Sequence, residues 1–193
     1  SVPSLPRSTL RPRTASEGRP WRRLKTSTWS PRKRSSPARD AIHTERSPVG
    51  LRVSTVDFGN WDTHVDQAGQ FADQVNILSS ALLAFWRDLE NHRDNVSVVV
   101  MSEFGRRLKS NESGGTDHGH GNAMMMLGPK VRGGQMYGKW PGLANGDLDE
   151  GADLAITTDY RSVLAEMMAG HMGFADRAAL FPGFDGEGLG YLA

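Results

Sequence analysis

The stretch FADQVNILSSALLAFWRDLENH at residues 71–92, followed closely by VSVVVMS at residues 96–102, decides the fold class. Apolar residues in the first part recur at alternating steps of four and three, which places them on one face of a helix. They are Phe71, Val75, Leu78, Leu82, Phe85 and Leu89. The second part is a short continuous apolar run, which is typical of a central strand in a parallel sheet. Together they predict an α/β protein with a mainly parallel sheet.

Two further strands are expected on either side of this unit. VGLRVSTVDF at residues 49–58 is rich in β-branched residues, and its acid Asp57 would lie at the carboxyl edge of the sheet. Strand, long helix and strand then form a crossover connection, which is right-handed by default. NAMMMLG at residues 122–128 predicts a third strand, with its methionines in the core.

A second helix is expected over residues 157–173, with Asp159 in its first turn. Its expected ends are Thr157 or Thr158 at the start and Gly170 or Gly173 at the finish. Residues 131–143 carry the Gly-Gly and Pro-Gly pairs of a hairpin or excursion, and the glycine-rich tail from residue 179 is expected to be irregular.

The composition limits what the chain can do. Its 193 residues suffice for one domain with a core, and they include no cysteine. Any metal ion must therefore be held by oxygen and imidazole nitrogen. No apolar run approaches the roughly 20 residues of a membrane helix, and no signal-peptide core is visible, so the sequence predicts a soluble chain without a membrane partner.

Residues 1–48 differ from the rest of the chain in charge and composition. They hold twelve Lys or Arg against three acids, and seven of the ten prolines. A segment with so few aliphatic residues is expected to be disordered. It is interpreted as an unstructured extension or as an arm that attaches to nucleic acid, with Trp21 and Trp29 available for stacking. Residues 49–193 form the predicted folded part.

Three polar clusters follow predicted strands. They are Asp57 with Asp62 and His64, then Ser102 and Glu103 with Arg106, then Asp117, His118 and His120. Because loops at the carboxyl ends of parallel strands converge on one crevice, these clusters are expected to meet there and bind a divalent cation. Each cluster alone has a simpler interpretation, as a solvated turn or, for Glu103 and Arg106, as an ion pair.

Six segments resemble one known family. They are DFGNWDTHVDQ, VVVMSEFGRR, GGTDHGHGN, GGQMYGKWPGL, ITTDYRSVLAEMM and FPGF. In this order they resemble the C-terminal part of the bacterial domain-of-unknown-function 1501 family, within the alkaline phosphatase and sulfatase superfamily. The resemblance covers about residues 49–184, and nothing before Val49 is similar to that family. It implies a partial α/β/α sandwich of the alkaline phosphatase-like type.

The resemblance also implies a metal centre. An aspartate and a histidine, here resembling Asp62 and His64, share one metal with a later histidine, either His118 or His120. Glu103 retains the acid of the second metal site, and Phe104 occupies the place of a histidine ligand there.

The nucleophile of that superfamily comes from an upstream half that this chain is expected to lack. Residues 1–48 are therefore also interpreted as out-of-frame translation joined to family sequence near Val49. The parent family is expected to be periplasmic or secreted.

The leading hypothesis is a truncated member of a family of metal-dependent hydrolases of phosphate or sulfate esters. Because the nucleophile half is expected to be missing, this chain is expected to bind metal but to be inactive alone, unless a metal-activated water replaces the missing group. Asp62, His64, Glu103, Asp117, His118 and His120 would hold Zn²⁺, Mn²⁺ or Ca²⁺. Arg106 would be catalytic, stabilising the charged transition state. The alternative is a non-catalytic secreted binding module on the same fold. Nucleic-acid binding through the basic arm ranks last, and a partner or a second copy is expected to cover the exposed sheet.

Overall fold

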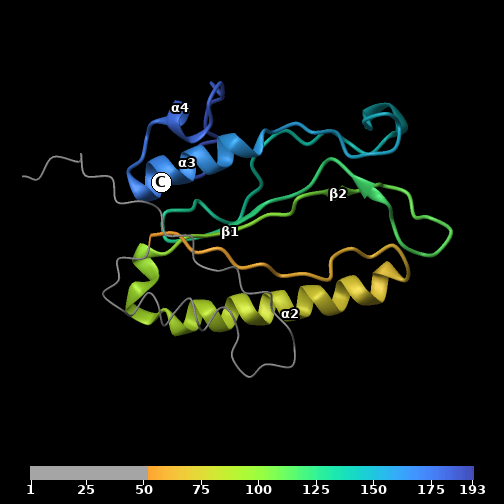
Figure 1. Ribbon diagram of the computed structural model, residues 1–193, viewed down its shortest axis with the longest axis horizontal. Helices are drawn as coiled ribbons and strands as arrows, with labels where there is room; N and C mark the ends of the chain where they lie inside the picture. Colours follow the sequence, from red (N-terminus) through yellow and green to blue (C-terminus); the bar gives the residue numbers. More distant parts are fainter. Residues whose placement is uncertain (1–51) are drawn as a thin grey trace, which may run out of the picture.

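The computed structural model describes residues 52–193, and the predictions for residues 1–48 lie outside them. The fold is mixed α/β (Figure 1). The main elements in chain order are α2 (Gln67–Asp88), β1 (Val98–Val100), β2 (Gly105–Arg106), β3 (His118–Gly119), β4 (Met125–Leu127), α3 (Tyr160–Met172) and α4 (Arg177–Leu180). Two short 3-10 helices, η1 (Glu90–Asn95) and η2 (Asn145–Asp147), connect them. None of the described helices combines the length and apolarity that crossing a membrane requires.

The long helix predicted over residues 71–92 is confirmed as α2, which begins earlier, at Gln67, and ends at Asp88. Leu89 follows as its C-cap and is buried. No residue within α2 is buried: Phe71 and Val75 of the predicted apolar face are 48% and 41% exposed, whereas Leu78, Leu82 and Phe85 are half-buried. Helix α2 therefore adds little to the core of the described residues.

The described strands pair antiparallel, so the mainly parallel sheet predicted from the sequence is wrong for them. Val99 of β1 lies opposite Met126 of β4, and Arg106 of β2 lies opposite His118 of β3. The second ladder is nested inside the first, so both belong to one long hairpin (Figure 1). After β1 and β2 the chain turns at about residues 107–117, and β3 and β4 then run antiparallel to β2 and β1.

The expected strand over residues 49–58 does not form in its described part, residues 52–58, where only Asp57 makes a bridge. Its apolar residues Val53 and Val56 are exposed. Without this strand, the predicted crossover into β1 is absent from the described residues. Segment 52–66 instead runs as an extended chain between α2 and the hairpin (Figure 1).

The core lies between α3 and the β1–β4 ladder. Val163 and Met167 of α3 and Tyr191 of the tail are buried together, and Val99 and Met126 pack against them. The partial burial of Met126 agrees with the predicted core role of the methionines, whereas Met125, one residue earlier, is exposed on the other face of the strand.

Helix α3 is close to its prediction, but its N-cap is Asp159, whose side chain accepts a hydrogen bond from the backbone N–H of Arg161. Gly173 ends the helix in a left-handed conformation, as glycine does most readily. The tail after residue 179 is mostly irregular, as expected, and it is tied to α3. Glu166 accepts hydrogen bonds from three backbone N–H groups of the tail, those of Leu189, Gly190 and Leu192.

Candidate metal centre

The first two side chains of the candidate site come from the irregular segment that precedes α2. Asp62 and His64 are two residues apart, and their side chains converge, with 2.9 Å between Asp62 Oδ1 and His64 Nε2. The intervening Thr63 is buried. This alternation is typical of extended backbone, in which residues i and i+2 lie on the same face. The D-x-H spacing thus brings a carboxylate and an imidazole together while Thr63 anchors the segment.

His118 supplies the third side chain from β3. Its Nε2 lies 2.7 Å from Asp62 Oδ1 and 3.2 Å from His64 Nε2. Asp62, His64 and His118 are the group of described residues whose side-chain atoms are close enough to share one metal ion. Ligand atoms about 2.0–2.1 Å from a tetrahedral zinc ion lie roughly 3.3 Å apart, so these three atoms resemble one face of such a tetrahedron.

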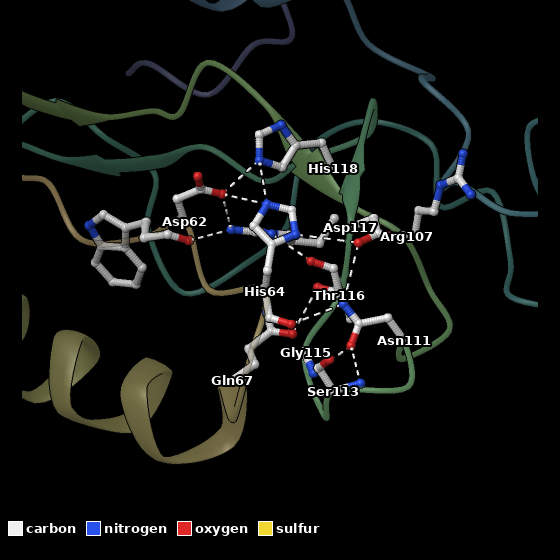
Figure 2. Close-up of polar contacts among 12 residues, drawn as sticks. Asp62, His64, Gln67, Arg107, Asn111, Ser113, Gly115, Thr116, Asp117 and His118 are labelled. Carbon is white, nitrogen blue, oxygen red and sulfur yellow. Dashed lines mark hydrogen bonds and ion pairs between the residues drawn. The ribbon is translucent and has the colours of Figure 1, made fainter.

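Asp117 and Asn111 orient His64 from the side away from this group (Figure 2). His64 Nδ1 lies 3.3 Å from Asp117 Oδ1. Asn111 donates from its side-chain amide to the backbone carbonyl of His64 at 2.9 Å and to Asp117 Oδ1 at 3.3 Å. A neutral His64 that donates its Nδ1 proton to Asp117 presents an unprotonated Nε2 to Asp62 and His118. This is the tautomer and the carboxylate support that metal-binding histidines use.

Arg106 ties the two parts of the site together. Its guanidinium donates to the backbone carbonyls of Thr116 and Trp61, both at 2.6 Å, and to Asp62 Oδ1 at 3.1 Å. The side chain is mostly buried. Arg106 therefore joins the segment that carries Asp62 to the loop that precedes His118.

The electrostatics favour ionised carboxylates at the site. The hydrogen bond with His118 lowers the pKa of Asp62, and the nearby charge of Arg106 lowers it further. Hydrogen bonds from Asn111 and His64 likewise lower the pKa of Asp117. The side chains of Asp62, His64 and His118 are 62%, 42% and 48% exposed, so a cation or substrate can reach them from solvent.

The other two predicted ligands lie elsewhere. Glu103 is exposed in the turn between β1 and β2, outside the converging group. His120 lies beyond the end of β3, with its Nδ1 3.5 Å from Asp149 and 3.8 Å from the buried Asp153. Of the two histidines that the sequence left as alternatives, His118 is the one beside Asp62 and His64.

Sequence reasoning missed the role of Asn111. Its side-chain oxygen accepts from the backbone N–H groups of Ser113 and Gly115, which closes the loop around His64. The sequence signal was present, because asparagine shortly before a Gly-Gly pair is typical of a tight turn closed by a side chain.

The fold and the site define a mixed α/β domain that carries an exposed group of one carboxylate and two imidazoles, supported by a second carboxylate. Residues 29–181 match the model of a family described as "Protein of unknown function (DUF1501)", and the chain belongs to this family. The match starts at residue 29 and includes part of the basic segment, so the prediction that nothing before Val49 is similar to this family is wrong for residues 29–48. Comparisons with curated proteins and with solved structures found no match.

Proposed function

We propose that Asp62, His64 and His118 bind one divalent cation and that the site belongs to a hydrolase of phosphate or sulfate esters. The observation that carries the proposal is the convergence of three potential ligand atoms, one carboxylate oxygen and two imidazole nitrogens, within 2.7–3.2 Å. The placement of this group in a chain that resembles the alkaline phosphatase and sulfatase superfamily supports the choice of reaction.

The chemistry of the donors favours particular metals. Two imidazoles and one carboxylate suit Zn²⁺ or Mn²⁺ better than Ca²⁺, which prefers six to eight oxygen ligands. Three protein ligands also leave a coordination position open, as catalytic zinc sites do. A cation there would supply Lewis-acid polarisation of an ester oxygen.

The residues of the chain would prepare this chemistry. Asp117 holds His64 with its Nε2 directed at the site, and Arg106 holds Asp62 while its charge adds to the positive potential. The exposure of Asp62 and His118 leaves an approach for the ester from solvent. Hydrolysis transfers the phosphoryl or sulfuryl group to water and returns the proton to the leaving alcohol.

Metal binding is tested by titrating the full chain with Zn²⁺ and with Mn²⁺ in a calorimeter. His118→Ala is expected to weaken binding by more than the roughly 10–100-fold that loss of a supporting residue costs, because it removes a ligand atom. His120→Ala is the matched control, two residues along the same loop, and is expected to retain wild-type affinity. Equal affinity in wild type and His118→Ala would refute the site.

A non-catalytic binding module is the second candidate, and the geometry of Arg106 favours it. Its guanidinium is already engaged by two backbone carbonyls and by Asp62, which reduces its capacity to meet a charged transition state. Aryl phosphate and aryl sulfate esters with saturating Zn²⁺ or Mn²⁺ distinguish the two candidates. Turnover that His118→Ala abolishes would support the hydrolase, with metal-activated water in place of the missing nucleophile, whereas a binding module shows no turnover in any variant.

A further inference from the structure

We infer that Phe104 is a positioning residue that fixes the imidazole of His118 so that its Nε2 faces Asp62 and His64. The two rings are stacked, with centroids 4.0 Å apart and planes inclined by only 10°. A flat neighbour at this distance restricts rotation of the imidazole about its terminal side-chain torsion, which is otherwise broad. The inference rests on the proposed cation site and adds a residue that contributes no ligand atom to it.

Phe104 is itself held by the hairpin. Its backbone carbonyl accepts hydrogen bonds from Ser102 Oγ at 3.0 Å and from the side-chain amide of Asn122 at 2.7 Å. Ser102 lies in the segment between β1 and β2, and Asn122 lies in the segment between β3 and β4. Both sides of the hairpin therefore fix the backbone of Phe104, which makes its ring a stable support for His118.

Phe104 contacts two residues of the site, Arg106 and His118. The guanidinium carbon of Arg106 lies 5.0 Å from the centroid of the Phe104 ring, within the range of a cation–π contact. Arg106 donates to Asp62, and Asp62 contacts His118, which stacks on Phe104. Phe104 is thus coupled to both the imidazole and the carboxylate of the proposed site.

This arrangement gives Phe104 a defined function at a position where the superfamily resemblance leads one to expect a histidine ligand. The carbon ring cannot bind a cation, but it can hold the plane of the His118 imidazole, while the contact with Asp62 Oδ1 selects the ring edge that carries Nε2. Supporting residues around metal ligands typically change metal affinity by about 10–100-fold when they are replaced. Because a ring stack is weaker than a charged hydrogen bond, the lower end of this range is expected for Phe104.

The test compares Phe104→Leu with Phe104→Tyr in the full chain. Leucine keeps apolar volume and removes the flat ring, so Zn²⁺ affinity in calorimetry is expected to fall about tenfold. Tyrosine keeps the ring and is expected to stay within about threefold of wild type. Phe184→Leu is the matched control, because it also removes a ring that faces an arginine, at 4.6 Å from Arg161, and it is expected to leave affinity unchanged.

A second measurement needs no metal. The stacked Phe104 ring is expected to shift the NMR signals of the His118 ring protons upfield, and this shift should persist in Phe104→Tyr and disappear in Phe104→Leu. If the leucine variant does not fold, Phe104→Met, with an unbranched apolar side chain, takes its place in both measurements.

The outcomes separate this inference from the proposed function. If the wild type binds Zn²⁺ and Phe104→Leu binds it with equal affinity, the positioning role of Phe104 is overturned and the cation site remains intact. Absence of wild-type binding overturns the proposed function, and the NMR comparison then decides whether Phe104 orients His118. An unshifted His118 signal in the wild type refutes the inference directly.

Discussion

The two helices that flank the hairpin differ in what they bury. Helix α3 buries Val163 and Met167 against the β1–β4 ladder and Tyr191, and its Ala165 is buried as well. Helix α2 is longer, yet no residue within it is buried. The difference shows that helix length and an apolar stripe do not by themselves make a core, because a stripe stabilises a fold only where another element covers it.

The same contrast separates the core from the candidate site. Apolar packing stabilises the α3 side. A buried hydrogen bond adds to it, in which the Tyr191 hydroxyl donates to the backbone carbonyl of Val163 at 2.7 Å. Hydrogen bonds among exposed polar groups such as Asp62 and His118 hold the site. Changes in one region are therefore expected to leave the other largely intact. The following substitutions compare the stability of the α3 side with that of the exposed helix α2.

Tyr191→Ala is expected to have the largest effect on stability. Tyr191 is 2% exposed, and truncating a buried aromatic residue costs about 3–5 kcal/mol. Tyr191→Phe keeps the ring and loses the hydrogen bond to Val163, so it should cost about 1 kcal/mol. Denaturant unfolding measures both values, and a loss below about 1 kcal/mol for alanine would contradict the position of the core.

Asp159→Asn is expected to have a smaller effect that depends on pH. Hydrogen bonds from the Arg161 side chain hold the pKa of Asp159 below its usual value of 3.8. A carboxylate whose pKa is lowered by folding stabilises the protein above its unfolded pKa, and this contribution is lost as the pH falls through the folded pKa.

Asparagine retains the N-cap of α3, and the substitution removes the charge of Asp159 together with one acceptor for the Arg161 side chain. Both partners are 37% exposed, and solvent screening limits the expected loss at neutral pH to about 0.5 kcal/mol. Unfolding curves recorded at neutral pH and well below pH 3.8 should show this difference shrink with acidification. A constant difference would mean that the charge of Asp159 does not contribute.

Val75→Gln on α2 is expected to have the smallest effect. An exposed surface position usually tolerates substitution within about 0.5 kcal/mol. The same change at the buried Val163 is the matched control and should cost several times more, about 2 kcal/mol or above, because it buries an amide. A large loss at Val75 in denaturant unfolding would show that α2 is covered in solution.

The sequence predicted the elements better than their arrangement. The regular spacing of apolar residues located α2, and the apolar run of residues 96–102 located β1. Neither pattern carries information about strand direction, because a buried strand is apolar in a parallel or an antiparallel sheet. The nesting of β4 against β1 depends on the long hairpin between them, which no local pattern reveals.

The candidate site could also be predicted only in part, because local patterns indicate the residues of the site but not the direction in which each side chain points. The D-x-H spacing and the His-Gly-His loop contain the three residues that converge, Asp62, His64 and His118. The family resemblance leaves the choice between His118 and His120 open, and alternation along a strand would place both on one face. The ladder ends at Gly119, after which the chain turns His120 toward Asp149.

Gly115 carries a consequence for anyone who alters this protein. A Cβ atom at this position would collide with the backbone carbonyl of His64, so even alanine would push the imidazole off its place. Neighbouring Asn111 binds the same carbonyl from its side chain. Affinity tags, fluorophores or loop grafts are therefore better inserted in the exposed excursion around Met136 than in this turn.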